Sequence, residues 1–277
     1  MTQYKNNNIC TLVTSYYDIK SKFNKNIYLQ WMHTFMKIHT PIVLFTEINM
    51  IEHIISIRGD LPLQINIIPF NEIDTWKLYK DKWIEHHKMD PEMHHSPELY
   101  AIWAQKAFFV EKAIQENPFN TSYFFWCDIG AFRDPLINPV VLHSFPSIKY
   151  LEKDTILLMS VADMKDTDKI RKEDGIFGEI ISHTWNEVRL VGGLWGGGHN
   201  ACLKWKKEYQ QMLERYFNTN RFAGKDQQVM LSTYIENPSI AKVVTCTDIS
   251  KDKWFFLQYL LSDLNETYEL DITYQLM

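Results

Sequence analysis

Residues 123–133 of the chain read YFFWCDIGAFR, an aromatic run that ends in a carboxylate and a glycine. The first five residues are apolar, which is typical of a short strand that is buried on both faces. Polar groups directly after such a strand lie at the carboxyl edge of an α/β sheet, where these folds bind ligands. Asp128 offers oxygen atoms to a cation or a ribose, Gly130 permits a tight turn, and Arg133 offers a guanidinium to phosphate. We therefore expect a site for a nucleotide-diphosphate donor here, although a carboxylate that only caps the next turn would read the same.

Strands and helices alternate on both sides of this segment. We expect strands at Ile9–Tyr17, Ile42–Phe45, Leu63–Pro69, Thr155–Ala162 and Ala241–Cys246, and helices at Asn26–Ile38, Met50–Arg58, Pro97–Gln115, His199–Phe217 and Asp226–Tyr234. Residues 71–95 are charged and irregular, and residues 163–178 read as a charged loop or short helix. This order predicts an α/β fold with a mostly parallel central sheet flanked by helices. No linker or repeat divides the chain, so we expect one domain over residues 1–277.

Composition excludes several classes of protein. The formal charge of -5, with acidic and basic residues interspersed, argues against a broad surface for nucleic acid. No apolar run approaches the roughly 20 residues that cross a bilayer, and the polar N-terminus does not resemble a signal peptide. Cys10, Cys127, Cys202 and Cys246 form no CxxC pair, which indicates neither a zinc knuckle nor a disulfide framework. We expect reduced thiols and a cytoplasmic protein, which is compatible with peripheral contact with a membrane surface.

A second candidate site is the segment Gly192–Gly198, which has five glycines in seven positions. Glycine is costly in backbone entropy unless a close approach is needed, and the spacing fits neither a P-loop nor a GxGxxG fingerprint. We expect a floor beneath a sugar, formed by Gly193, Gly196 and Gly197, with Trp195 as a stacking face. The alternative is a flexible or bulged turn.

Two further positions belong to helices. Asp226 and Gln227 stand at the start of a predicted helix, where they would face a cleft, although an ordinary N-cap would read the same. Lys106 lies on the helix that begins at Pro97 and would reach a diphosphate across the carboxyl edge of the sheet. A solvated surface lysine is the alternative for it.

Four histidines raise the question of a metal site. His86, His87, His94 and His95 form two adjacent pairs rather than a helical HxxxH face, and adjacent side chains point in different directions. We therefore expect a solvated loop. His95 has more weight than the others because it directly precedes the helix start at Ser96.

Several longer strings resemble one family. LVTSYYDI near the start, VLFTE near residue 45, HSPELYAIWAQK at 95–106, FFWCDIGAFRD at 124–134 and GGLWGGG at 192–198 are similar to the HtrL/YibB-type family of glycosyltransferase-like proteins. The resemblance spans nearly the whole chain, in order. It implies a GT-A fold, a Rossmann-like sheet that binds a nucleotide-sugar, with residues 1–135 holding the donor and residues 136–277 the acceptor. It also implies transfer of a sugar, with a UDP-sugar favoured, to a glycan or glycoconjugate.

The resemblance also implies roles for residues of this sequence. Thr14, Ser15, Tyr16 and Thr46 would hold the nucleoside at the first strand ends. Asp128 would bind Mn²⁺ or Mg²⁺ on the diphosphate, although Asp128-Ile129-Gly130 has one carboxylate where the family's DxD motif has two. The Asp226-Gln227 pair would lie beside the reacting sugar, as a general base in an inverting enzyme or as a stabiliser of an oxocarbenium-like state in a retaining one.

Two other classes of function remain open at this point. A metal-dependent hydrolase would also need a carboxylate at a strand end, together with clustered carboxylates or histidines. A non-catalytic relative that only binds carbohydrate or nucleotide would use the abundant aromatic residues for stacking. Stabilisation by UDP, GDP or CMP, with and without Mn²⁺, distinguishes these classes.

Overall fold

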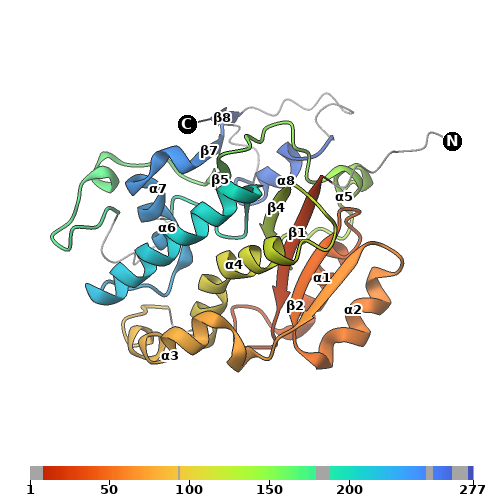
Figure 1. The fold of residues 1–277 in the computed structure, drawn as a ribbon, viewed down its shortest axis with the longest axis horizontal. Helices are drawn as coiled ribbons and strands as arrows, with labels where there is room; N and C mark the ends of the chain where they lie inside the picture. Colours follow the sequence, from red (N-terminus) through yellow and green to blue (C-terminus); the bar gives the residue numbers. More distant parts are fainter. Residues whose placement is uncertain (1–8, 93, 179–187, 248–251, 264–273, 277) are drawn as a thin grey trace.

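The computed structural model describes residues 9–92, 94–178, 188–247, 252–263 and 274–276, and these form a single α/β domain (Figure 1). The strands are β1 (Cys10–Tyr16), β2 (Ile42–Thr46), β3 (Leu63–Ile67), β4 (Tyr123–Cys127), β5 (Ile156–Ser160), β6 (Leu194–Gly198), β7 (Ala241–Cys246) and β8 (Tyr274–Leu276). The helices are α1 (Lys25–Phe35), α2 (Ile51–Arg58), α3 (Asp74–His87), α4 (Pro97–Glu116), α5 (Pro139–Ser144), α6 (His199–Asn218), α7 (Asp226–Glu236) and α8 (Phe256–Leu260). Most of the predicted elements are confirmed within a few residues of their predicted ends.

All of these strands belong to one sheet of eight strands, in the order β3-β2-β1-β4-β6-β5-β7-β8. The pairs β2–β3, β1–β2, β1–β4 and β5–β7 are parallel, whereas β6 runs antiparallel between β4 and β5, and β8 runs antiparallel to β7. The expected fold class, a mostly parallel sheet flanked by helices in one domain, is confirmed. The antiparallel strand β6 was not expected.

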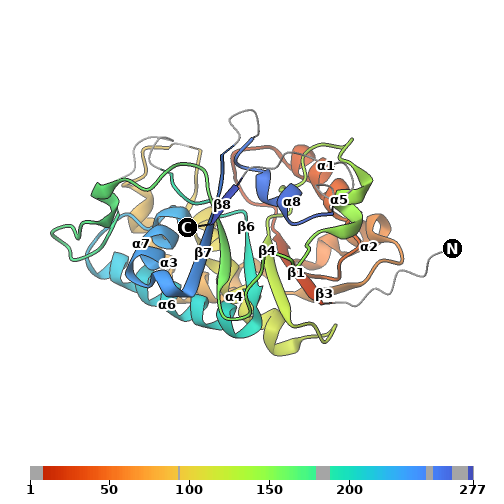
Figure 2. The ribbon, with the colours of Figure 1, turned by 90° about the horizontal axis from the view of Figure 1, so that it is seen from above.

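Helices cover both faces of the sheet (Figures 1 and 2). α3, α4, α6 and α7 lie on one face, and α1, α2, α5 and α8 lie on the other. The aromatic strand β4 serves both layers, because successive side chains of a strand point to opposite faces. Phe124 and Trp126 belong to the first core, and Phe125 and Cys127 to the second. This double burial explains why the strand is apolar at every position.

The ends of α4 follow from its sequence. Ser96 accepts a hydrogen bond from the Leu99 amide through its hydroxyl, at 3.3 Å, and Pro97 occupies the first turn. Asn117 ends the helix with φ of 34°, a left-handed conformation that asparagine tolerates better than most residues. The helix packs between the sheet and α3, with Lys106 near its middle.

Two local predictions are wrong. Residues 74–87 form helix α3 rather than an irregular stretch; only Thr75, Trp83 and His86 of this helix are buried, so its apolar stripe is narrow. For the glycine segment, the alternative of a flexible or bulged turn is wrong, because residues 194–198 are the buried strand β6. A Cβ atom on Gly196 would lie 2.6 Å from Phe125 Cα of β4, and one on Gly197 would lie 2.5 Å from the Thr155 carbonyl oxygen beside β5. These glycines therefore permit close strand packing.

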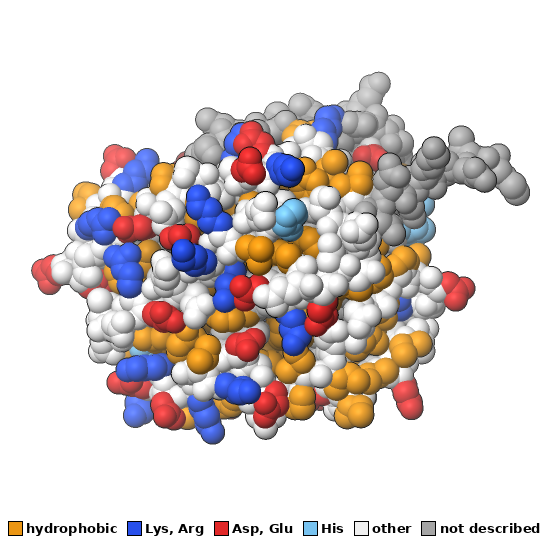
Figure 3. All heavy atoms as spheres, in the orientation of Figure 1, with side chains coloured by type: hydrophobic (Ala, Val, Ile, Leu, Met, Phe, Trp, Pro, Cys, Tyr) orange, Lys and Arg blue, Asp and Glu red, His pale blue; other side chains and the backbone are white. Residues whose placement is uncertain are grey.

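The surface carries charges of both signs. On the face shown in Figure 3, Lys and Arg side chains alternate with Asp and Glu, and no extended area of one sign is seen. Among the described residues, no helix is both long and apolar enough to cross a membrane. The four cysteines are buried and none of them forms a disulfide.

Candidate functional site

A cavity of about 540 Å³ opens at the carboxyl edge of the sheet. It is lined by the last residues of β1, Ser15 and Tyr16, and by residues that follow β4, including Asp128 and Gly130. The chain runs from β1 to β2 and β3 on one side and then crosses to β4 on the other, so β1 and β4 flank the point where strand order reverses. Ligands of open α/β sheets bind at this switch point. A cavity of this volume is typical of a small-molecule site.

Asp128 is held at this edge by its own strand and by the antiparallel neighbour. Its backbone amide donates to the Gly193 carbonyl at 2.7 Å, and its Oδ1 accepts from Trp126 Nε1 at 2.6 Å. The side chain remains 40% exposed, within the cavity. The carboxylate is thus fixed in orientation and still open to a ligand.

Lys106 reaches from α4 to the two carboxylates of the site. Its Nζ lies 3.2 Å from Asp128 Oδ1 and 3.0 Å from Asp226 Oδ2, and it donates to the Gly192 carbonyl at 3.0 Å. Burial lowers the pKa of Lys106, but the two carboxylates outweigh burial and the net pKa is raised. The ammonium group therefore stays charged at neutral pH. Lys106 is 5% exposed, so the alternative of a solvated surface lysine is wrong.

Asp226 begins α7 and is almost fully buried. Burial raises its pKa, Lys106 opposes that change, and the charge of Asp128 adds to it, so that the net pKa lies above the usual value for aspartate. Space for both carboxylates comes from the glycine pair before β6. A Cβ atom on Gly192 would lie 2.6 Å from Asp226 Oδ2, and one on Gly193 would lie 3.0 Å from Asp128 Oδ2.

Arg133 borders the same cavity and is surrounded by aromatic rings. Its guanidinium carbon lies 4.2 Å from the ring centre of Trp31 and 5.0 Å from that of Phe255, and Nε donates to the Gly130 carbonyl at 3.0 Å. Gly130 leaves room for this packing, because a Cβ atom there would lie 2.8 Å from the Trp31 ring. Arg133 is thus positioned as a cation at the wall of the cavity.

The predicted site residues separate into two groups. Those that line the cavity are Ser15, Tyr16, Lys106, Asp128, Gly130, Arg133, Gly193, Asp226 and Gln227. Those that do not are Thr14, Thr46, Trp195, Gly196 and Gly197. Thr14 and Thr46 are fully buried within their strands, and the Thr46 hydroxyl donates to the Tyr16 carbonyl at 2.7 Å.

Trp195 is the clearest correction. It is 2% exposed and belongs to the core between the sheet and α6, with its ring centre 6.3 Å from that of Trp205. Strand alternation turns Trp195 toward the helices, and Gly196 and Gly197 pack against β4 and β5. None of these three residues forms a sugar floor.

Other lining residues were not identified from the sequence. Trp103 and Tyr28 supply aromatic walls, and Lys225 adds a cation to Lys106 and Arg133. Trp103 stands one turn before Lys106 on α4, so an i, i+3 argument from Lys106 would have found it. Tyr28 gives no comparable signal.

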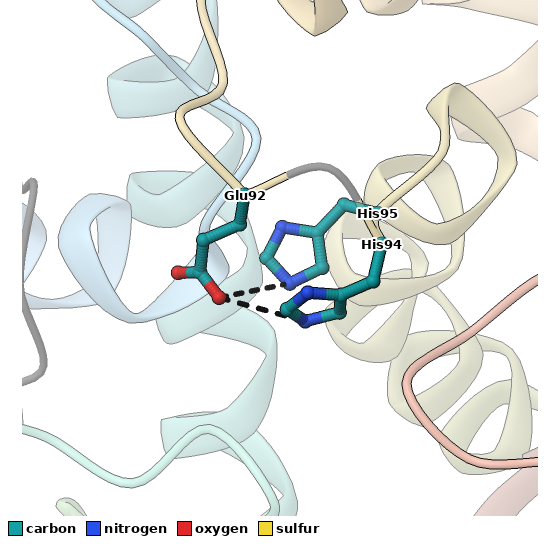
Figure 4. A group of neighbouring side chains, drawn as sticks. All are labelled: Glu92, His94 and His95. Carbon is teal, nitrogen blue, oxygen red and sulfur yellow. Dashed lines mark ion pairs between the residues drawn. The ribbon is translucent and has the colours of Figure 1, made fainter.

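A further cluster borders the cavity in the segment before α4 (Figure 4). The side chains of Glu92, His94 and His95 point toward one another. His95 Nδ1 lies 2.7 Å from Asp90 Oδ2, which also accepts a hydrogen bond from the Tyr100 hydroxyl. His95 is 5% exposed, and His86 is fully buried on α3, so the expectation of a solvated loop is wrong for both residues.

The expected cation at Asp128 does not fit the residues around it. Asp128 Oδ1 already accepts from Trp126, and the Lys106 ammonium lies within 3.4 Å of Oδ2 as well as near Oδ1. Both oxygens of Asp128 thus already face the Lys106 ammonium, and neither is left to a divalent ion. The ammonium itself balances the carboxylates.

The described geometry can be compared with known proteins. A model of the family described as "Bacterial protein of unknown function (HtrL_YibB)" matches residues 8–262. The chain is also 22% identical over 273 residues to the protein named "Protein HtrL" of Escherichia coli (strain K12), a match that covers 89% of this chain and 90% of that one. The matched region includes every cavity residue named above. The chain therefore belongs to the HtrL_YibB family.

Proposed function

We propose that the chain is a glycosyltransferase of GT-A type, which moves a sugar from a nucleotide-diphosphate sugar, with a UDP-sugar favoured, to a glycan or glycoconjugate acceptor. The observation that carries the proposal is the buried Asp226, which has a raised pKa and is ion-paired with Lys106 opposite Asp128 at the switch point of the sheet. A carboxylate whose pKa is raised toward neutrality is suited to proton transfer.

The donor fits the half of the cavity between β1 and β4. Ser15 and Tyr16 at the end of β1 offer polar groups to a ribose, in the place where α/β sheets bind nucleotides. Trp103 and Tyr28 offer faces on which a base or a sugar ring can stack. Arg133 offers a fork of donors to the diphosphate.

The proposed reaction, written for the inverting case, uses these residues as follows. The acceptor hydroxyl oxygen forms a bond to the anomeric carbon while the bond from that carbon to the diphosphate breaks. Asp226 takes the hydroxyl proton, and the diphosphate leaves with the bonding electron pair. Arg133 and Lys106 offset the negative charge that develops on the departing group, which is the electrostatic stabilisation such a step needs. Asp128 orients a hydroxyl group of the donor, and Gln227 lies beside the reacting carbon.

No step of this proposal requires Mn²⁺ or Mg²⁺ at Asp128, since Lys106 occupies the position of a counter-charge there. The proposed reaction takes place in the cytoplasm, with a nucleotide-sugar as the donor and a glycan or glycoconjugate as the acceptor.

The test combines binding and turnover. UDP, GDP and CMP are screened by thermal shift, because a ligand that binds only the native state raises Tm. Release of nucleoside diphosphate from a panel of nucleotide-sugars is then measured for the natural chain and for Asp226→Asn, Asp128→Asn and Asp81→Asn. Asp81 is exposed on α3 outside the cavity and serves as the matched control.

We expect a Tm increase with a nucleoside diphosphate, and a loss of turnover of about 100-fold or more in Asp226→Asn, as is typical when a general base is removed. Asp81→Asn should retain full activity. Turnover by Asp226→Asn equal to that of the natural chain would contradict the role of Asp226.

A non-catalytic relative is the second candidate, because Lys106 already neutralises part of the carboxylate charge without a ligand. It predicts a Tm increase with nucleotide and no turnover with any donor and acceptor. A hydrolase predicts that nucleoside diphosphate is released at the same rate with and without acceptor.

A further inference from the structure

Glu92, His94 and His95 bring three metal-ligating atoms to one point of the cavity wall (Figure 4). Glu92 Oε2 lies 3.5 Å from His94 Nε2 and 3.7 Å from His95 Nε2. All three atoms lie within 4.8 Å of one another. The two imidazoles come from adjacent residues, yet their rings pack edge to face, with centres 4.2 Å apart.

These separations match those of a metal centre. A tetrahedral ion with bonds of about 2.0–2.1 Å to nitrogen and oxygen places its ligand atoms about 3.3 Å apart. The two separations from Glu92 Oε2 exceed that value by only a few tenths of an ångström, and the ligand atoms of His94 and His95 lie within 4.8 Å of each other. A small rotation of the side chains would therefore bring all three atoms to bonding distance of a single ion.

The groups behind the ligands favour metal binding over a simple ion pair. His95 Nδ1 faces Asp90 Oδ2 at 2.7 Å, which places the ring proton on Nδ1 and leaves the lone pair of Nε2 directed at Glu92. Asp90 is itself held by the Tyr100 hydroxyl and by the Glu92 amide at 2.8 Å. A carboxylate behind a ligating histidine is a regular feature of metal sites, because it fixes the tautomer and the ring orientation.

Glu92 is also held in place by a neighbouring side chain. Its Oε1 is ion-paired with Lys225 Nζ, and its Oε2 is left to face the two imidazoles. Lys225 directly precedes Asp226, and both residues line the cavity together with Glu92, His94 and His95. A metal held by three protein atoms keeps at least one coordination position for another ligand, and the three residues that would hold it line the cavity.

We propose that Glu92, His94 and His95 bind one divalent first-row transition-metal ion, such as Zn²⁺, at the wall of the cavity. Two imidazoles and one carboxylate favour zinc or another late first-row ion over magnesium, calcium or manganese, which prefer oxygen ligands. Metal binding does not depend on the proposed sugar transfer, since a ligand set of this kind binds the ion whatever reaction the cavity supports.

The test is direct binding to the full-length chain. Zn²⁺ is titrated by calorimetry after chelator treatment, and Co²⁺ is added separately because its visible absorption reports coordination by protein ligands. We expect one ion per chain and no competition from a hundredfold excess of Mg²⁺. The Zn²⁺ affinity should fall by about 100-fold or more in His94→Ala and in Glu92→Gln. Changes to residues behind the ligands typically cost about 10–100-fold. Asp90→Asn should show such an intermediate loss.

A second histidine pair provides the matched control. His39 and His143 face each other with Nδ1 atoms 3.0 Å apart, at the opposite edge of the sheet. His143→Ala should leave the Zn²⁺ affinity unchanged. Circular dichroism confirms that each variant is folded. Unchanged Zn²⁺ affinity in folded His94→Ala and Glu92→Gln, or its loss in His143→Ala alone, would overturn the proposal.

Discussion

Lys106 Nζ lies 3.0 Å from Asp226 Oδ2, in a pair whose side chains are only 6% and 8% exposed. The lysine comes from α4, the aspartate from the first position of α7, and both reach the cavity beyond the carboxyl edge of the sheet. A buried pair of this kind is not a strong source of stability, because both ions lose their hydration. Replacing only one of the two residues is nevertheless costly, because the other charge then stays buried without its partner.

Lys106→Met should lower the free energy of unfolding by about 3–5 kcal/mol, because it leaves Asp226 buried without its cation and next to Asp128. The methionine retains most of the apolar stem, so lost packing contributes little. Urea unfolding at neutral pH measures the change. Lys206→Met is the matched control: its ion pair with Glu111, at 2.9 Å, is more exposed, and we expect a cost of about 1 kcal/mol or less. Equal costs for the two variants would mean that Asp226 does not depend on Lys106.

Gly192→Ala should impair the site more than the fold. The added Cβ would lie 2.6 Å from Asp226 Oδ2, so the carboxylate must move away from Lys106. We expect a loss of about tenfold or more in turnover, since displacement of a catalytic group by about 1 Å is enough to cost 100-fold. Nucleoside-diphosphate affinity should change little, because the donor half of the cavity is untouched. Gly130→Ala provides the contrast: it meets the Trp31 ring at 2.8 Å and should weaken donor binding through Arg133.

Much of the site could be predicted because its signals are local. Asp128 follows an apolar run of strand length, and Lys106 lies on a helix with a clear cap and first-turn proline. No local pattern shows that these residues lie close together in space. Lys106, Asp128 and Asp226 meet because the chain crosses the sheet between β3 and β4 and returns through β6. The resemblance to a family, rather than spacing, suggested that these residues belong together.

The errors also have physical causes. Leu194–Gly198 is buried on both faces, and a short buried strand has no alternation from which to read the direction of Trp195. Glycine in a strand and glycine in a loop look alike in sequence, although here the glycines admit neighbouring backbones. Helix α3 was missed because a long charged segment buries only three side chains. Adjacency in sequence predicts that the side chains of His94 and His95 diverge, whereas their rings pack edge to face with centres 4.2 Å apart.

Substitution of two tryptophans tests which of them contributes to ligand binding. Trp103 lines the cavity, whereas Trp195 is 2% exposed in the core beside α6. Trp103→Ala should weaken nucleoside-diphosphate binding, by about 1–3 kcal/mol if a base stacks on this ring. Trp195→Phe should leave binding unchanged and lower the free energy of unfolding by about 1–3 kcal/mol, since it leaves a void in a packed core. Calorimetric titration with UDP and urea unfolding of both variants provide the two measurements. The reverse pattern would restore Trp195 to the binding site.

His86 gives the fold a dependence on pH. The ring is fully buried, and its Nδ1 accepts a hydrogen bond from the Ala223 amide at 3.1 Å, which only the neutral imidazole can do. Burial is the main cause that lowers its pKa below 6.5, the nearby charge of Glu85 opposes it, and Lys82 lowers it further. The unfolded chain therefore takes up a proton at a higher pH than the folded chain does. The contribution of His86 to stability is complete above about pH 6.5 and decreases as the pH falls from there toward the folded pKa, by about 1.4 kcal/mol for each unit between the two values.

His86→Asn tests this origin of the pH dependence, because the asparagine amide oxygen can accept the Ala223 hydrogen bond and does not titrate. We expect the variant to lose stability at neutral pH through the smaller side chain, and to show a flatter decline of the unfolding free energy than the natural chain between about pH 6.5 and pH 5. Urea unfolding over that range measures both quantities. His53→Asn on the exposed face of α2 should leave the slope unchanged, because that side chain meets solvent in the folded and unfolded states alike. If the unfolding free energy of His86→Asn declines with pH as steeply as that of the natural chain, another group causes the acid sensitivity. An imidazole with the same pKa in the folded and the unfolded chain contributes nothing to that decline.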